Sequence, residues 1–314
     1  MLHKNYLILA HKNPEQLLEL ITQLNDAFST FYIHIDKKTD ITPFTDLLPK
    51  LENIIFIQKP FDVIWCDHST VEATLYVLKE IIKQQTKGHC ILISGQDFPI
   101  KSNKHINDFL EENKDYDFID IHSIPTDEWY QKGLNRINHY KFNLSSKRGH
   151  FVICPSIYEK KFYNISNLKS VIKLALNVKL KFIFKLFQRR KKPEHIQPYG
   201  GSQWWCLKTD TIRNILTFCE HHPEFLAYHK YTLLSDEIFF QSVIMHLKNS
   251  IDLKIQNSLT FVDWGRDVPI KPPTFSINDN ELLINQPKNK LFARKFDSDY
   301  DNGIIHFLKN HLKN

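Results

Sequence analysis

Short apolar runs alternate with amphipathic segments through the first 120 residues, and this alternation restricts the fold more than any other feature of the chain. Residues 6–10 and 31–35 are apolar runs of strand length, and leucine and isoleucine recur at helical spacing in 14–25 between them. The pattern continues with predicted strands at 53–58, 89–94 and 117–121 and with predicted helices at 69–83 and 104–112. This rhythm predicts an α/β fold with a mostly parallel central sheet and helices on both faces.

A polar residue follows several of these predicted strands. His11 follows the first strand, Asp36 follows the second and Asp97 follows the fourth. Ligands of open parallel sheets bind at the carboxyl ends of the strands. We therefore expect His11, Asp36 and Asp97 to border a ligand-binding site.

The composition argues against several classes of protein. The chain has 314 residues, of which 42% are hydrophobic and only 8 are glycine, so a glycine-rich phosphate loop is not expected. Its five cysteines include no Cys-x-x-Cys pair, which disfavours a zinc site or a disulfide scaffold and fits a reducing cytoplasm. No apolar run approaches the roughly 20 residues that span a bilayer, and the N-terminal run is too short for a signal peptide.

The basic segment 171–192 carries much of the net charge of +6 and mixes lysine and arginine with leucine, isoleucine and phenylalanine. One interpretation is an interfacial helix that docks on an anionic membrane. The alternative is a solvated helix whose apolar side covers the core. We expect a cytoplasmic protein that contacts the inner face of the cell membrane through this segment and that does not bind nucleic acid.

The last third returns to regular structure, with predicted strands at 204–207 and 259–263 and predicted helices at 210–219, 235–248 and 303–312. Ser235 is a candidate N-cap, which places Asp236 and Glu237 in the first turn of its helix. Acids in that position complement the helix dipole, or one of them deprotonates a substrate hydroxyl, and the local sequence leaves both roles open. Ser69 followed by Glu72 likewise predicts a capping box at the start of the helix 69–83.

Eight short motifs occur in order over roughly residues 6 to 300. The most specific are Ser-Gly-Gln-Asp-Phe-Pro-Ile-Lys at 94–101 and Phe-Ala-Arg-Lys-Phe-Asp at 292–297. The others are the runs at 9–12, 33–38, 64–73, 201–205, 235–240 and 262–266. Together they resemble the core-2/I-branching β-1,6-N-acetylglucosaminyltransferase family, which includes the peptide O-xylosyltransferases, and the chain looks like a bacterial-type member.

The resemblance implies a GT-A type fold and one catalytic domain, 1–314, with a nucleotide-binding half at 1–124 and an acceptor-binding and catalytic half at 125–314. It also implies an inverting reaction without a metal or other cofactor. The resemblance assigns the catalytic base to Glu237. It assigns the neutralisation of the leaving diphosphate to Lys295 and a second cation, for which Arg266 is our choice and Lys271 the alternative.

The remaining site residues follow partly from the resemblance, namely Ala10, His11, Asp36, Glu128 and Arg136, and partly from the chemistry of their side chains. On the donor side they are Ala10, His11, Asp36, Trp65 and Asp97, with Asp97 either orienting the donor sugar or bracing the site. On the acceptor side they are Glu128, Arg136, Trp205, Asp236 and Trp264. Because adjacent strand residues point to opposite faces, only one of Trp204 and Trp205 is expected to reach a ligand.

Two Asp-x-Asp pairs have the spacing with which many GT-A enzymes bind manganese, namely Asp115 with Asp117 and Asp299 with Asp301. Such pairs arise readily by chance in a chain with 24% charged residues, and the first precedes its strand instead of following it. We therefore favour a site without metal, and a metal-dependent GT-A enzyme remains the alternative.

The predicted reaction moves a sugar from a UDP-sugar to a hydroxyl of a glycan or lipid-linked glycan, in the synthesis of cell-surface polysaccharide or lipopolysaccharide. N-acetylglucosamine is the first choice for the sugar. Xylose and glucuronic acid are the alternatives, and the run Gly-Ser-Gln-Trp-Trp at 201–205 favours the xylosyltransferase branch.

Overall fold

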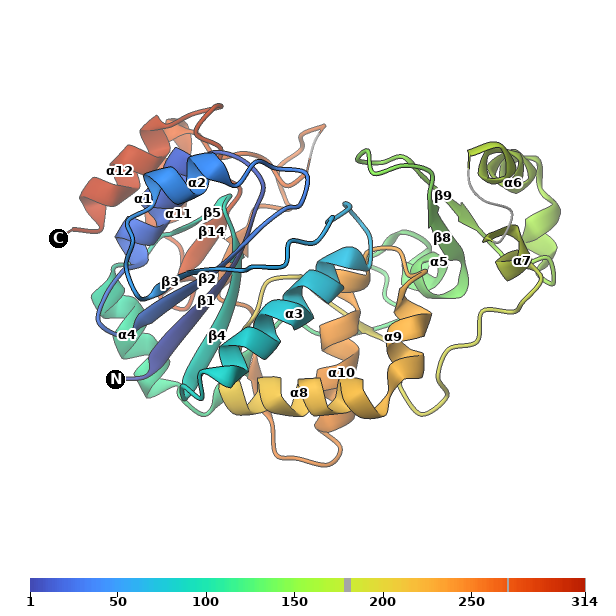
Figure 1. Ribbon diagram of the computed structural model, residues 1–314, viewed down its shortest axis with the longest axis horizontal. Helices are drawn as coiled ribbons and strands as arrows, with labels where there is room; N and C mark the ends of the chain where they lie inside the picture. The colour runs from blue at the N-terminus through green and yellow to red at the C-terminus, as the bar shows by residue number, and fades with distance from the viewer. Residues whose placement is uncertain (178–181, 270, 314) are drawn as a thin grey trace.

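The computed structural model describes residues 1–177, 182–269 and 271–313. A seven-stranded sheet with the order β12-β6-β11-β4-β1-β2-β3 forms its centre (Figure 1). These strands are β1 (His3–Ala10), β2 (Ser29–Ile35), β3 (Ile54–Phe56), β4 (Gly88–Ser94), β6 (Tyr116–Phe118), β11 (Cys206–Lys208) and β12 (Lys254–Gln256). Only β11 runs antiparallel to its neighbours β4 and β6. The prediction of an α/β fold with a mostly parallel central sheet is therefore confirmed.

Helices cover both faces of this sheet, as predicted. One layer contains α1 (Pro14–Leu24), α2 (Thr42–Leu47), α4 (Asn103–Glu112), α11 (Asn280–Ile284) and α12 (Gly303–His311), and the other contains α3 (Ser69–Lys83), α8 (Thr209–His221), α9 (Pro223–His229) and α10 (Phe239–Leu247). The alternation of strand side chains produces both interfaces. Tyr6 and Ile8 of β1 pack into the first layer, whereas Leu7 between them packs into the second.

Three smaller sheets lie beside the central one. They pair β13 (Thr260–Val262) and β5 (Asp97–Pro99) with β14 (Phe292–Arg294), β7 (His122–Ser123) with β10 (Tyr199–Gly200), and β8 (Tyr140–Asn143) with β9 (Phe151–Cys154). The β8–β9 hairpin, α6 (Ile165–Asn177) and α7 (Ile183–Leu186) lie to one side of the central sheet (Figure 1). The short helix α5 (Leu134–Asn138) precedes this hairpin.

Three local predictions need correction. Ser69 is the first residue of α3 and does not cap it, because its hydroxyl accepts a hydrogen bond from the Ile64 amide. Ser235 opens a 3₁₀ turn, Ser235–Glu237, and α10 begins only at Phe239. The predicted strand 204–207 begins two residues later, at Cys206.

The basic segment is only partly a solvated surface. Lys179 and Lys181 lie outside the described residues. Arg190, which the sequence groups with the surface cations, points inward and donates hydrogen bonds to the carbonyls of Arg136, His139 and Tyr228 and to the Thr232 hydroxyl. Its guanidinium therefore anchors the segment to the core. Among the described residues, no helix is long and apolar enough to cross a bilayer.

Candidate active site

Glu237 lies at the end of the 3₁₀ turn that precedes α10. Its Oε2 is 2.5 Å from Nη1 of Arg136, a residue 101 positions earlier in the chain. The turn starts after Leu234, whose backbone is left-handed and whose amide donates to the carbonyl of Cys66 over 3.1 Å. Glu237 thus lies against the loop that carries Trp65 and Cys66, at the edge of the sheet where the first strands end.

The charge state of this carboxylate is set by two opposing effects. Burial raises the pKa of Glu237, while the charge and hydrogen bond of Arg136 lower it. The neighbouring Asp236 is buried, and burial and the charge of Glu237 raise its pKa. Arg136 opposes the effect of burial and favours the ionised form of Glu237, which is the state that a general base requires. Asp236 is 8% exposed, as Asp36 is, and its predicted contact with an acceptor stays a prediction.

Arg136 is itself fixed by an aromatic ring. Its guanidinium lies 3.6 Å from the centre of the Trp129 ring, which also packs edge-on against His122. A Cβ at Gly200 would come within 2.3 Å of the same ring, so this position requires glycine. Arg136, predicted as an acceptor residue, therefore positions the Glu237 carboxylate in this structure. Glu128 lies at the rim with a side chain that is 75% exposed.

Asp36 organises the loop at the ends of β1 and β2. Its amide donates to the carbonyl of Ala10, and its carboxylate accepts from the amides of Lys38 and Val63 at 2.9 and 3.2 Å. Lys38 also forms an ion pair with this carboxylate. These contacts hold the segment that ends at Trp65, whose side chain is 48% exposed. Asp36 and Trp65 therefore lie on one ledge at the sheet edge.

Ala10 and His11 border the same ledge. The His11 side chain is exposed, and its carbonyl accepts a hydrogen bond from the Thr39 hydroxyl over 3.0 Å. Gly95, at the end of β4, approaches closely: a Cβ there would lie 3.2 Å from the Cβ of Ala10. The ends of β1, β2 and β4, which the sequence analysis predicted to border a ligand-binding site, thus lie close together.

Lys295 and Arg148, two cations near this ledge, form no ion pair of 4.0 Å or less among the described residues, although Asp297 lies near Lys295. Lys295 follows β14, and burial and the charges of Arg294, Arg148 and Lys12 lower its pKa. Arg148 lies in the turn of the β8–β9 hairpin, and its guanidinium is 4.8 Å from the centre of the Trp65 ring. An unpaired lysine and arginine beside an exposed tryptophan form a binding environment for a phosphorylated aromatic ligand.

Sequence reasoning missed Arg148. Its only local signal is the basic turn Ser-Ser-Lys-Arg-Gly at 145–149, which is typical of an ordinary solvent-exposed hairpin. The contact of Arg148 with Trp65 joins positions 83 residues apart in the chain. The periodicity of apolar residues carries no information about a contact between positions so far apart.

The predicted second cation, Arg266, already has anionic partners. Its guanidinium forms ion pairs with Asp263 at 2.9 Å and Asp279 at 2.6 Å. The alternative, Lys271, is exposed and donates to the carbonyl of Trp264, whose side chain is also exposed. In this arrangement Arg266 stabilises its own loop, while Lys271 and Trp264 remain accessible.

Asp97 and Trp205 are both buried. Asp97 is 0% exposed and forms an ion pair with Arg294 at 3.2 Å, so of its two predicted roles it fits the bracing one, holding β5 against β14. Trp205 is 2% exposed and packs against Phe240, so it belongs to the core and does not reach an acceptor. Trp204 is also buried, under the guanidinium of Arg294 at 4.0 Å.

The two Asp-x-Asp pairs have structural partners. Asp117 accepts from the Lys208 amide and the Thr211 hydroxyl, next to the start of α8. Asp301 accepts from the amides of Ile277 and Gly303, the latter at the start of α12. In each pair the second carboxylate therefore holds a helix start in place.

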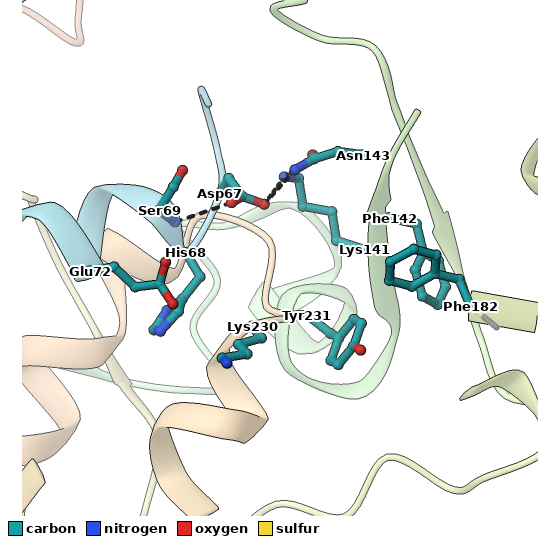
Figure 2. A pocket seen from close by; sticks show the side chains of 10 residues that line it. All are labelled: Asp67, His68, Ser69, Glu72, Lys141, Phe142, Asn143, Phe182, Lys230 and Tyr231. Atoms are coloured by element: carbon teal, nitrogen blue, oxygen red, sulfur yellow. Dashed lines mark hydrogen bonds and ion pairs between the residues drawn. The ribbon is translucent and has the colours of Figure 1, made fainter. Parts of the chain in front are cut away.

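A polar cavity of about 280 Å³ opens beside the site (Figure 2). Asp67 and Lys141 form an ion pair of 2.8 Å in its wall, and Asn143 donates to the same carboxylate. His68 is buried, and neither ring nitrogen has a hydrogen-bond partner among the described residues. Phe142, Phe182 and Tyr231 supply an aromatic side (Figure 2). Polar groups beside aromatic rings are typical of binding pockets for polar organic ligands.

A family model described as Branch: Core-2/I-Branching enzyme matches residues 5–283. Xylosyltransferase oxt from Drosophila pseudoobscura pseudoobscura is 24% identical over 316 residues, covering 92% of this chain and 31% of the relative. Xylosyltransferase 2 from Mus musculus is 23% identical over 327 residues, covering 98% of this chain and 33% of the relative. The chain thus spans about a third of the length of these curated relatives.

Among solved structures, the 4-diphosphocytidyl-2C-methyl-D-erythritol synthase from Anaerococcus prevotii DSM 20548 aligns with 99% of this chain and 96% of its own length. Its TM-score is 0.40 and its sequence identity is 10%.

Proposed function

The chain belongs to the core-2/I-branching enzyme family, and from this membership and the geometry around Glu237 we propose that it is an inverting glycosyltransferase. It moves a sugar from a UDP-sugar to a hydroxyl of a glycan or lipid-linked glycan in cell-surface polysaccharide or lipopolysaccharide synthesis. The observation that carries the proposal is the Glu237 carboxylate, which Arg136 holds at 2.5 Å beside the ledge formed by the strand ends.

In this mechanism Glu237 removes the proton of the acceptor hydroxyl as its oxygen attacks the anomeric carbon of the donor. The bond from that carbon to the diphosphate breaks on the opposite face, so an α-linked donor gives a β-linked product. Arg136 favours the ionised form of Glu237 and fixes the direction of its carboxylate. The pKa of Glu237, which burial raises, makes it a better proton acceptor than an exposed glutamate.

The leaving UDP gains negative charge as the bond breaks, and a preorganised cation nearby stabilises that charge. Lys295 and Arg148 suit this role because neither forms an ion pair with another described residue. Trp65 lies under Arg148 and offers a flat surface to the nucleoside. Two cations supply the positive charge that a divalent metal supplies in other transferases, which supports a reaction without metal.

N-acetylglucosamine is our first choice for the transferred sugar. The names of the xylosyltransferase relatives favour xylose as the alternative. A thermal-shift screen with UDP, UDP-N-acetylglucosamine, UDP-xylose and UDP-glucuronic acid tests the proposal. A ligand at a hundredfold excess over its Kd stabilises the folded state by about 2.7 kcal/mol. Failure of every UDP compound to raise the melting temperature contradicts the proposal, and loss of transfer in EDTA contradicts only its metal-free part.

We expect Arg148→Ala to weaken UDP binding and transfer more than Arg266→Ala. Arg148 has no carboxylate partner among the described residues, whereas Arg266 is neutralised by Asp263 and Asp279. Loss of one charge-assisted hydrogen bond costs about 1.5–3 kcal/mol, or roughly tenfold to a hundredfold in KM for the donor. Steady-state kinetics of both variants measure the difference in KM for the donor. A larger defect in Arg266→Ala than in Arg148→Ala would mean that Arg266 is the second cation that contacts the diphosphate.

We also propose that α6 attaches the enzyme to the inner face of the cell membrane. Ile165, Leu168, Ile172 and Leu176 recur at helical spacing and are all exposed, which leaves an apolar stripe on α6. Lysines at 169 and 173 flank the stripe and are exposed. Apolar side chains flanked by lysine match the acyl and headgroup layers of an anionic membrane. Such attachment brings the enzyme to a lipid-linked acceptor.

The double variant Ile172→Asp/Leu176→Asp is expected to lose binding to vesicles of phosphatidylglycerol and phosphatidylcholine. Burial of one exposed leucine contributes about 1.5–3 kcal/mol, so the loss is about tenfold or more in partition coefficient. Ile41→Asp is the matched control, because Ile41 is also an exposed isoleucine but lies outside α6. We expect it to leave co-sedimentation of the protein with the vesicles unchanged. Equal binding by wild type and the double variant contradicts the membrane role of α6.

A further inference from the structure

We infer that His195, His222 and Glu224 form a zinc-binding site on the opposite end of the second helical layer from Glu237. Each residue contributes one ligand atom, and the three atoms lie within 4.8 Å of one another. Two imidazoles and one carboxylate are a donor set typical of Zn²⁺. No sequence motif predicts this site, because it lacks the paired cysteines that are the usual signal of a zinc site.

The distances suit a tetrahedral ion. Zinc bonds of about 2.0–2.1 Å place the ligand atoms of a tetrahedron about 3.4 Å apart. Nδ1 of His222 lies 3.0 Å from Oε1 of Glu224, and Nε2 of His195 lies 3.8 Å from the same oxygen. These two separations bracket the tetrahedral value. On these two edges the ligands need shifts of only a few tenths of an ångström, and the two imidazole nitrogens, which lie within 4.8 Å of each other, approach by up to about 1.4 Å to bind the ion.

Two of the ligands stand on a rigid corner. His222 joins the end of α8 to the start of α9, where Pro223 fixes the backbone, and its amide donates to the carbonyl of Phe218. The Phe218 ring also packs against the His222 ring at 4.5 Å. Glu224 follows in the first turn of α9. A metal site built on helix ends retains its geometry better than one built on loops.

The third ligand is positioned by its neighbours. Ile196 is buried and its amide donates to the carbonyl of Pro193, which fixes the backbone beside His195. His246 of α10 hydrogen-bonds the backbone of His195, and its ring lies 6.1 Å from the ring of His195 and 5.9 Å from that of His222. This hydrogen bond and the neighbouring His246 ring restrict the position of His195.

The ion would connect segments that are distant in the chain. His195 belongs to the connection that leads from the basic segment back to β10, while His222 and Glu224 belong to the α8–α9 corner. All three side chains are accessible from solvent, so an ion can enter without unfolding. The expected role is to hold this connection on the core. Glu237 remains the proposed base in sugar transfer, and among the described residues no contact connects it to this cluster.

Untagged protein, stripped with EDTA and dialysed, tests the inference when it is titrated with zinc chloride. We expect one zinc ion per chain by calorimetry and elemental analysis, together with a higher melting temperature. His222→Gln and Glu224→Gln each weaken zinc binding by at least about tenfold, because loss of a group that only supports a ligand already costs about 10–100-fold in metal affinity. His221→Gln is the matched control, because that exposed ring hydrogen-bonds the Thr217 carbonyl of its own helix and does not face the cluster.

Wild type that binds no zinc, or variants that bind it as tightly as wild type, overturn the inference. His195→Gln supplies an independent variant on an exposed loop in case His222→Gln folds poorly. The stripped protein is also assayed for sugar transfer. Full transfer activity without zinc agrees with a structural site. Loss of transfer activity without zinc contradicts metal-independent catalysis, and the zinc titration still decides whether this site exists.

Discussion

Glu237→Gln is expected to reduce sugar transfer by about 10²–10⁴-fold while UDP binding is retained, since this range is typical for loss of a general base. The amide has nearly the shape of the carboxylate, so Arg136 still has an oxygen to donate to. It cannot accept the proton of the acceptor hydroxyl. Transfer to a true acceptor and the Kd of UDP, measured on the same preparation, separate loss of chemistry from loss of folding.

Glu112→Gln is the matched control, because Glu112 is exposed at the end of α4, and it leaves transfer unchanged. The pH profile adds a second readout. Burial raises the pKa of Glu237, so kcat/KM of the wild type falls as pH drops through a value above the ordinary glutamate range. The variant loses this acid limb. If Glu237→Gln transfers sugar as fast as wild type, another group is the base.

The regular elements near the N-terminus were predictable because their signals are local. Helix 69–83 was predicted with its observed bounds, and the strands 6–10 and 31–35 lie inside β1 and β2. Each of these elements has a repeat of apolar residues that burial on the sheet requires. The prediction of an N-cap at Ser235 was wrong for a tertiary reason. The Leu234 amide donates a hydrogen bond to the Cys66 carbonyl, and after this long-range contact the chain forms a tight turn in place of the α-helix.

The site was only partly predictable for the same reason. Asp36 and Glu237 were identified through motifs, but the partner of Glu237 lies 101 residues away, and its role as a positioning group is visible only in space. Trp205 was assigned to an acceptor site because tryptophan often stacks on sugars, yet the strand begins one residue later and its ring turns into the core. The chemistry of a side chain follows from its type, whereas its accessibility follows from the fold.

Lys295→Ala is expected to lower kcat by about 10²–10³-fold, the range found when one preorganised group that stabilises developing negative charge is removed. The ammonium has no ion-pair partner among the described residues, and the positive charges around it outweigh the negative charge of Asp297, which makes an anion a favourable neighbour. Transfer should fall more than UDP binding, because the leaving diphosphate is more negative in the transition state than in the bound donor.

Two comparisons make this test specific. Lys295→Arg keeps the charge and should recover part of the lost rate, while Lys288→Ala, at an exposed lysine between α11 and β14, should change nothing. The double variant Arg148→Ala/Lys295→Ala then measures coupling between the two cations. Residues that share one diphosphate give a combined effect different from the sum of the single effects, whereas independent residues give additive free energies. If Lys295→Ala transfers sugar at the wild-type rate, the leaving group is neutralised elsewhere, and the accessible Lys271 becomes the next residue to substitute.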